Sequence, residues 1–251
     1  SDESGHYVGD VMPYYENGKF YIYYLNDQRA GSRGYHPIWL TETTDFTTYS
    51  APVEAIPFVP DYSSQDLAIG TGSLLKDNSG IYHFWYTGHN DTNNVYQVEK
   101  LQHATSTDLH TWTKHPLDGF YGPSYAKYDF RDPYLLYMAS ESKYWMLVTT
   151  KNSSNESVIE KYTSTDLVHW TDAGVFYKNT KGTYNMECPT LFKKGEYWYL
   201  TFSAQLDLGQ SRTVNYRYST NLTNWTVPTN EKLDGAGFYA GRVVEKENRH
   251  F

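Results

Sequence analysis

The sequence has little cysteine, little basic charge and no long apolar runs. Its 251 residues contain one cysteine, Cys188, so an internal disulfide is excluded. The formal net charge is −8, and no basic stripe is present to neutralise phosphates, so we expect no nucleic-acid partner. No apolar run approaches the roughly 18 residues of a membrane span, so we expect no membrane partner.

Targeting and metal-binding patterns are absent as well. The N-terminal residues, Ser-Asp-Glu-Ser-Gly, lack the pattern of a signal peptide, so we expect a soluble protein, cytoplasmic or secreted with its signal removed. The nine histidines show no His-Glu-x-x-His spacing, and no compact Asp-x-Asp-x-Asp loop occurs. We therefore expect no metal and no other cofactor, and the oligomeric state is left open.

Aromatic residues, by contrast, are abundant. They make up 18% of the chain, with 26 tyrosines and seven tryptophans. Such residues favour pleated, half-buried surfaces, and the 3.6-residue periodicity of long helices is missing, so the sequence predicts an all-β protein. Tyrosine and tryptophan also suit the faces of sugars, because each offers an apolar plate with a polar edge.

One phrase recurs four times along the chain. In each copy an apolar stretch ends in three polar residues, and an aromatic residue follows. The first of the three is Ser or Thr, the second is Thr, and the third is Asp or Asn, namely Asp45, Asp108, Asp166 and Asn221. These copies are about sixty residues apart. Short polar side chains there bond nearby backbone and form a turn, so we expect the phrase to be structural and its acids not to be catalytic.

The repeat predicts the architecture. Each copy contains a first strand, a tight turn such as Asn17-Gly18, an aromatic strand, and two further strands around the recurring phrase. Four strands in about sixty residues is typical of a β-propeller blade. A fifth opening strand is expected over 237–244. We therefore predict one catalytic domain, residues 1–251: a five-bladed β-propeller with four-stranded antiparallel blades, the fifth blade incomplete.

Three acidic residues stand where repeats open: Asp10, Asp132 and Glu187. The spacing to the hairpin turns predicts equivalent positions on the innermost strands, where the side chains would meet at one mouth of the central channel. The second repeat has no acid there and contributes Thr71, Gly72 and Ser73. Carboxylates gathered at one mouth repel one another and are costly to desolvate, so this pattern favours function over stability.

The same residues carry a resemblance to a known family. Phe130-Arg131-Asp132-Pro133 resembles the Arg-Asp-Pro motif of glycoside hydrolase family 32, the invertase, levanase and fructanase family, within the wider group of families 32, 43, 62 and 68. Met186-Glu187-Cys188-Pro189 resembles its Glu-Cys-Pro motif. Thr71-Gly72-Ser73 is similar to its pocket strand, and Phe238-Tyr239-Ala240 to its fifth-blade opening. The family's first motif, Asn-Asp-Pro-Asn-Gly, is here Gly9-Asp10-Val11-Met12-Pro13.

The resemblance implies a glycosidase that cleaves a fructoside or related furanoside in a small carbohydrate or oligosaccharide, by a retaining double displacement. It implies that Asp10 is the nucleophile, that Glu187 is the acid and base, and that Asp132 holds sugar hydroxyls. The residues expected to bind substrate are Arg131, Thr71, Gly72, Ser73 and Tyr239.

Two alternatives stay open. An inverting glycosidase of the family 43 type, an arabinofuranosidase or xylosidase, also uses two Asp and one Glu. Carboxyl separations of roughly 5–5.5 Å accompany retention and roughly 6.5–9.5 Å accompany inversion. The second alternative is a sugar-binding propeller without catalytic activity, with an altered first motif.

Overall fold

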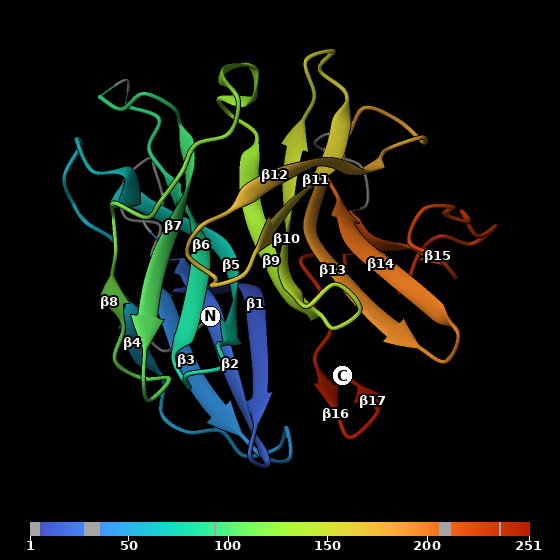
Figure 1. Ribbon diagram of the computed structural model, residues 1–251. Coiled ribbons are helices and arrows are strands. Elements are labelled where there is room, and N and C mark those ends of the chain that lie inside the picture. Colours follow the sequence, from blue (N-terminus) through green and yellow to red (C-terminus); the bar gives the residue numbers. More distant parts are fainter. Residues whose placement is uncertain (1–5, 28–35, 93, 206–211, 236) are drawn as a thin grey trace.

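The computed structural model describes residues 6–27, 36–92, 94–205, 212–235 and 237–251, and within these ranges the protein is built almost wholly of strands (Figure 1). The helical elements there are two short 3-10 turns, η1 (Gln65–Leu67) and η2 (Ser124–Ala126). Both lie in loops that lead into the first strand of a sheet. The prediction of an all-β protein is confirmed.

The strands form successive antiparallel sheets in which the strand order follows the chain. The first sheet contains β1 (Tyr7–Glu16), β2 (Lys19–Asp27), β3 (Ile38–Thr43) and β4 (Val53–Ile56), and the second contains β5 (Ala68–Lys76), β6 (Tyr82–His89), β7 (Glu99–Ser106) and β8 (Thr113–Lys114). The third sheet contains β9 (Phe130–Met138), β10 (Lys143–Lys151), β11 (Ser157–Ser164) and β12 (Thr171–Lys178). The fourth has three strands, β13 (Met186–Lys194), β14 (Tyr197–Ala204) and β15 (Thr213–Ser219).

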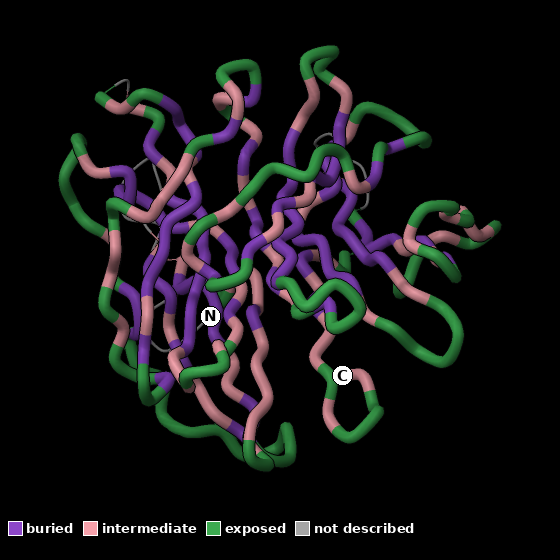
Figure 2. Tube along the Cα trace, in the orientation of Figure 1, coloured by how far each residue is buried: buried purple, intermediate pink, exposed green. Residues whose placement is uncertain are grey.

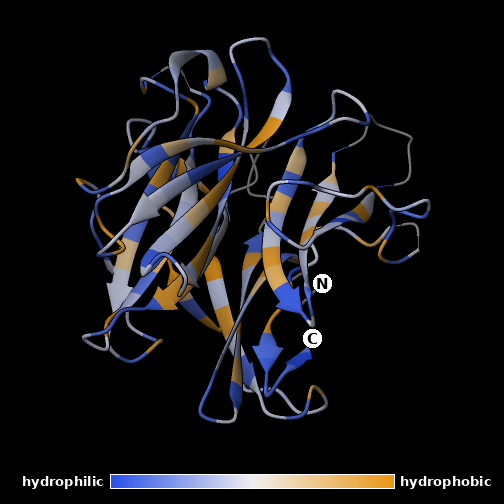
Figure 3. Ribbon diagram, turned by 45° about the vertical axis from the view of Figure 1, so that its right-hand side comes forward, coloured by the Kyte–Doolittle hydropathy of each residue, from blue (hydrophilic) through white to orange (hydrophobic). Residues whose placement is uncertain are grey.

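The first strands of successive sheets lie against one another, β1 against β5, β5 against β9, and β9 against β13. The sheets therefore radiate from a shared hub, as Figure 1 shows, and the arrangement is a β-propeller with four blades. The described residues form no complete fifth blade, in agreement with the predicted incomplete blade. After the fourth blade the chain forms a short hydrophilic hairpin, β16 (Glu245–Lys246) and β17 (Arg249–His250) (Figure 3).

Two expectations about the end of the chain need correction. The fourth blade has a three-stranded ladder, and its outer edge is continued by isolated bridges, Tyr218 to Thr226 and Asn215 to Lys232. The expected strand over 237–244 is not a strand. This segment contacts the fourth blade without forming a strand ladder. For example, the Ala240 N–H donates to Ser203 Oγ at 2.8 Å.

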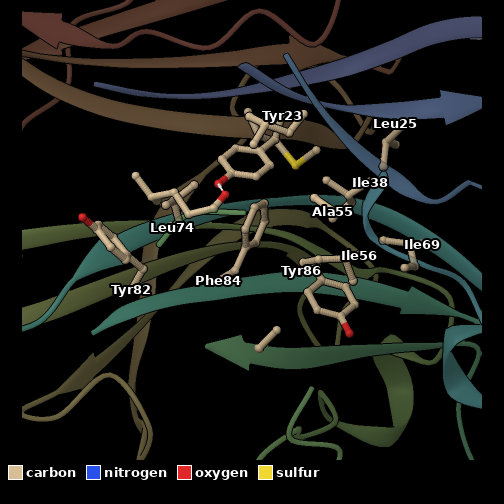
Figure 4. Close-up of a cluster of buried hydrophobic side chains, with 14 residues drawn as sticks. Tyr23, Leu25, Ile38, Ala55, Ile56, Ile69, Leu74, Tyr82, Phe84 and Tyr86 are labelled. Atoms are coloured by element: carbon tan, nitrogen blue, oxygen red, sulfur yellow. Dashed lines mark hydrogen bonds between the residues drawn. The ribbon is translucent and has the colours of Figure 1, made fainter. Parts of the chain in front are cut away.

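The hydrophobic core is divided among the joints between blades. Figure 4 shows the joint of blades one and two, where Tyr23 and Ile38 face Phe84 and Tyr86. Similar clusters join the second blade to the third and the third to the fourth. Buried residues accordingly lie along the middle of the strands, and exposed ones lie in the turns (Figure 2). Each blade is thus stabilised mainly by its neighbours.

The recurring phrase is a turn that pins adjacent blades together. In the second blade, Ser106 Oγ accepts the N–H groups of Asp108 and Leu109, and Asp108 Oδ1 accepts those of His110 and Thr111. Leu109 has a φ of 67° and its carbonyl accepts from the Tyr23 hydroxyl of the first blade at 2.5 Å. The predicted turn is therefore present in the structure, and it also fixes the joint between blades.

The C-terminal hairpin spans the seam between the fourth blade and the first. Its His250 ring packs on Phe192 of β13, with ring centroids 4.8 Å apart. On the other side, the Phe251 ring contacts Phe20 and Phe46 of the first blade. The hairpin therefore connects the two ends of the open ring.

Candidate active site

The inner strands carry a bulge near their N-terminal ends, and the bulges aim the acidic side chains. In the third blade Arg131 pairs with Thr149, and the next two residues stand opposite a single residue of β10. In the fourth blade Glu187 pairs with Ser203 before the same irregularity. Asp132 and Cys188 come next, at φ of 57° and 50°, a left-handed conformation that turns each side chain away from the regular alternation.

This register corrects the expectation that the three acids are equivalent. Asp132 corresponds to Cys188, and Glu187 corresponds to Arg131. Asp10 lies at the irregularity between Gly9 and Val11 of β1. The expectation is wrong by one residue, because the glycines used to align the hairpin turns are not equivalent: Gly18 is the second residue of its turn, whereas Gly195 is the first.

The structure nevertheless brings Asp10 and Asp132 together around Cys188. The buried Cys188 sulfur lies 3.9 Å from Asp10 Oδ2 and 3.7 Å from Asp132 Oδ2. The Cys188 N–H donates to Asp132 Oδ2 at 2.9 Å, and the Thr71 hydroxyl donates to Asp10 Oδ2 at 2.5 Å. Asp132 is 4% exposed. Side chains from all four blades thus meet at one end of the hub.

Glu187, next to Cys188 in the chain, has a fixed partner on each carboxylate oxygen. Arg131 donates from Nε to Glu187 Oε1 at 2.9 Å, and its Nη2 lies 2.9 Å from the same oxygen. The Tyr239 hydroxyl donates to Oε2. The Glu187 side chain is 13% exposed. Glu187 is therefore held at the rim of the hub by the third blade and by the segment after the fourth.

Arg131 is itself held by groups that the sequence did not single out. Its Nη1 donates to Glu99 Oε2 at 3.1 Å and to Asp129 Oδ1 at 3.2 Å. Glu99 is buried and also accepts the Phe130 N–H at 2.8 Å. Glu99 stands at the start of a strand without a recognisable motif, so no sequence signal pointed to it. Together these contacts set the direction of the guanidinium toward Glu187.

Two carboxyl groups at the hub have raised pKa values. Burial, together with the nearby Asp132 carboxylate, raises the pKa of Glu187 to about 7, and Arg131 opposes the shift. Burial likewise raises the pKa of Asp132 to about 6, with Arg131 lowering it and Asp10 raising it. Burial and the neighbouring carboxylates also raise the pKa of the Cys188 thiol, so this cysteine is a neutral packing group.

The three residues expected from the second blade are placed differently from one another. Thr71 lies at the acids, where its hydroxyl contacts Asp10. A Cβ at Gly72 would come 2.2 Å from the Trp85 carbonyl oxygen, so this glycine permits close packing of β5 on β6. Ser73 Oγ donates to the Pro133 carbonyl and accepts the Leu135 N–H, which joins β5 to β9. Gly72 and Ser73 therefore hold the hub together, and only Thr71 reaches an acid.

Two further residues at the hub were missed by the sequence reasoning. Thr87 on β6 accepts the Asp132 N–H at 2.9 Å and donates to the Thr71 carbonyl at 3.0 Å. Arg242 is buried and donates to the Pro189 carbonyl at 2.5 Å, and its positive charge favours the ionised form of Asp132. Both lie on segments whose place at the hub depends on contacts between blades.

Among the described residues, no group of three or more His, Cys, Asp or Glu side chains is arranged to hold a metal ion. In the same ranges, no helix is long and apolar enough to cross a membrane.

Comparison with known proteins places these motifs in context. The sequence model of the Glycosyl hydrolases family 32 N-terminal domain matches residues 11–250, a range that begins just after Asp10. The sucrose-6-phosphate hydrolase of Escherichia coli is 27% identical over 203 residues, which cover 78% of this chain and 40% of that protein. The chain therefore spans less than half the length of this relative.

Solved structures share the fold. The sucrose-6-phosphate hydrolase from Lactobacillus gasseri superimposes with a TM-score of 0.78 at 22% identity, covering 94% of this chain and 51% of that one. A family 32 β-fructofuranosidase from Bombyx mori gives a TM-score of 0.79 at 19% identity, covering 97% and 53%. These similarities support the propeller architecture.

Proposed function

The chain belongs to glycosyl hydrolase family 32, and from the geometry of its hub we propose that it is a catalytic domain that hydrolyses fructosides with retention of anomeric configuration. The observation that carries the proposal is the environment of Glu187. A carboxyl group with a pKa of about 7 lies beside two further carboxylates from other blades. A general acid that is protonated near neutral pH is what cleavage of a glycosidic bond requires.

In the proposed first step, Asp10 attacks the anomeric carbon while Glu187 protonates the leaving oxygen. Asp10 Oδ2 accepts from Thr71, so Oδ1 is the attacking atom. Glu187 Oε1 accepts from two guanidinium nitrogens, so its proton resides on Oε2, the oxygen that faces Tyr239. The glycosidic bond breaks, a bond from carbon to Asp10 forms, and the leaving alcohol keeps the proton.

In the second step, Glu187 takes a proton from water as the water attacks the anomeric carbon. The bond to Asp10 breaks, which restores both carboxyl groups. Asp132 accepts hydrogen bonds from sugar hydroxyls, and its position beside Asp10 places negative charge near the developing oxocarbenium ion. Arg131 holds Glu187 in place through both steps.

The names of the relatives guide the choice of substrates: sucrose 6-phosphate, sucrose and β-linked fructans. The test is turnover of this panel, together with aryl arabinofuranosides and xylosides, by the wild-type chain and by Glu187→Gln. In aqueous methanol, NMR of the methyl glycoside formed reports the stereochemistry.

A methyl β-fructofuranoside made by the wild type, and lost in Glu187→Gln, supports the proposal. Release of an inverted product would favour an inverting enzyme of the family 43 type. Binding of sugars without any turnover by the wild type would show that the domain is a sugar-binding module.

A further inference from the structure

Exposed tyrosines gather on the loops beside the acids. Tyr96 and Tyr128 are 71% and 62% exposed, and Tyr121 between them is 39% exposed. Tyr96 lies in the loop between β6 and β7, and the other two lie in the loop that carries η2 and leads into β9. Both loops stand at the end of the molecule where β9 begins, which is the end that holds Arg131 and Asp132 (Figure 1).

The two loops are tied into one unit. The Tyr96 and Tyr121 rings meet edge to face, with centroids 5.7 Å apart. Beside them, Gln97 Nε2 donates to the Gly122 carbonyl at 2.9 Å. The Val98 and Glu99 N–H groups donate to the Lys127 carbonyl at 3.2 and 3.3 Å. The rings therefore stand on backbone that is held in place, so a ligand would not have to order the loops when it binds.

This tyrosine surface is continuous with the acids. The Tyr128 carbonyl accepts from Arg131 Nη1 at 3.1 Å, and the same guanidinium holds Glu187. Glu99, at the base of the Tyr96 loop, holds Arg131 from the other side. Both loops that carry the tyrosines thus contact the guanidinium that holds Glu187, so a sugar chain that leaves the hub past Glu187 on this side would reach them.

The chemistry of the surface fits a neutral sugar chain. Tyrosine rings offer apolar faces with a hydroxyl at the edge, which matches the alternation of C–H faces and hydroxyls on a sugar. The nearby cations, Lys100 and Lys127, lie over the Tyr121 and Tyr128 rings at 5.1 and 5.4 Å from the centroids. Each lysine lies against one ring, and the three tyrosines keep exposed aromatic area that a sugar could contact.

We propose that Tyr96, Tyr121 and Tyr128 form a docking surface for the part of a neutral oligosaccharide that extends past the cleaved bond, so that the enzyme favours fructo-oligosaccharides over sucrose. This inference rests on the proposed function. It adds a preference for longer substrates, and it assigns this preference to residues outside the acidic hub.

The experiment compares kcat/KM for fructo-oligosaccharides of four to six units with kcat/KM for sucrose, in the wild type, in Tyr96→Ala, in Tyr128→Ala and in the double variant. The double variant is expected to lower the ratio about tenfold, and each single variant about threefold, since each ring contributes a stacking contact. The matched controls are Tyr137→Ala and Tyr197→Ala. These tyrosines are 49% and 41% exposed at hairpins on the opposite end of the blades, and their loss is expected to leave the ratio unchanged.

A second readout does not depend on turnover. Glu187→Gln protein is run through native gels that contain inulin or levan, with and without the tyrosine substitutions. Retardation that is lost in the Tyr96→Ala and Tyr128→Ala background supports the surface.

The two proposals fail in different ways. Hydrolysis of sucrose with an unchanged ratio in the double variant, or a wild type that prefers sucrose 6-phosphate to neutral oligosaccharides, would overturn the tyrosine surface and leave the proposed function standing. A wild type that cleaves no glycoside would overturn the function, and the gel measurement would then decide the surface alone.

Discussion

Two sets of acids recur in this molecule, one in the turns and one at the hub, and their environments are opposite. Asp108 and Asp166 in the turns accept backbone N–H groups. These bonds hold the pKa of the Asp108 carboxyl well below its usual range, and for Asp166 the His169 side chain and the backbone N–H groups together do so against the effect of burial. At the hub, burial raises the pKa of Asp132 and Glu187. The turn acids are stabilised as anions, whereas the hub acids are held near like charges.

The difference shows how to separate structural from functional carboxylates. Both sets come from repeated positions, so repetition alone does not distinguish them. In the fourth blade an amide replaces the turn acid: Asn221 Oδ1 accepts the Thr223 and Asn224 N–H groups at 3.0 and 2.9 Å. The turn therefore also forms around a neutral acceptor. The hub gathers carboxylates from different blades, at a cost in stability that a structural role does not require.

The largest expected effect separates the two sets by activity. Asp10→Asn and Glu187→Gln are each expected to lower kcat by about a thousandfold or more, because in the proposed mechanism each removes a group that reacts with the substrate. Asp108→Asn and Asp166→Asn, the matched turn variants, are expected to retain kcat within about twofold. Initial rates on sucrose, with circular dichroism to confirm folding, check this. Equal losses in both sets would remove the distinction.

The pH profile is the next effect. Burial raises the pKa of Glu187 to about 7, and the proposed mechanism needs the proton on Glu187 for cleavage, so kcat/KM is expected to fall as the pH rises above about 7. Arg131 favours the ionised form of Glu187, so in Arg131→Met this fall in kcat/KM, the alkaline limb of the pH profile, is expected to move to a pH about one unit higher. Asp108→Asn is expected to leave the limb in place. A limb that moves downward in Arg131→Met would contradict the assignment.

A smaller effect concerns stability at the hub. The folded-state pKa of Asp132 is raised, so the folded protein binds more protons than the unfolded chain between about pH 4 and 6, and stability falls as the pH rises through this window. Asp132→Asn is expected to stabilise the protein by on the order of 1–2 kcal/mol at pH 8, and less at pH 4. Urea unfolding at the two pH values measures the difference, and a variant that is less stable at pH 8 would argue against a strained carboxylate.

The smallest effect concerns the turns. Asp108→Ala is expected to destabilise the protein by about 1 kcal/mol, since two backbone N–H groups lose their acceptor, whereas Asp108→Asn keeps the acceptor as Asn221 does. The folded-state pKa of Asp108 is depressed, so its charge-dependent contribution is present above about pH 4 and lost as the pH falls below it. Thermal unfolding of the two variants at pH 7 and pH 3 tests this, and equal destabilisation by Asn and Ala would show that the charge matters.

The parts of this fold that the sequence predicts are those encoded locally. The turn phrase contains its own hydrogen-bond acceptors and the aromatic residue that packs beneath it, so four blades were predictable. That Asp10 and Asp132 meet at the hub was predictable because each stands where a repeat opens, and their catalytic roles stay a prediction. The bulges were not predictable, because the left-handed conformations of Asp132 and Cys188 are imposed by pairing with distant strands. Glu99 and Arg242 reach the hub only through contacts between blades, which no spacing rule reveals.

The seam between the fourth blade and the first has a consequence for the proposed catalysis. Tyr239, the partner of Glu187 Oε2, lies on the segment after the fourth blade, and the hairpin beyond it anchors on Phe20 of the first blade through Phe251. In the proposed mechanism, the proton donor thus contacts a segment that is tethered across the seam. A molecule with a loosened seam would keep most of its sheets and lose this contact, so we expect its catalytic rate to depend on closure of the ring.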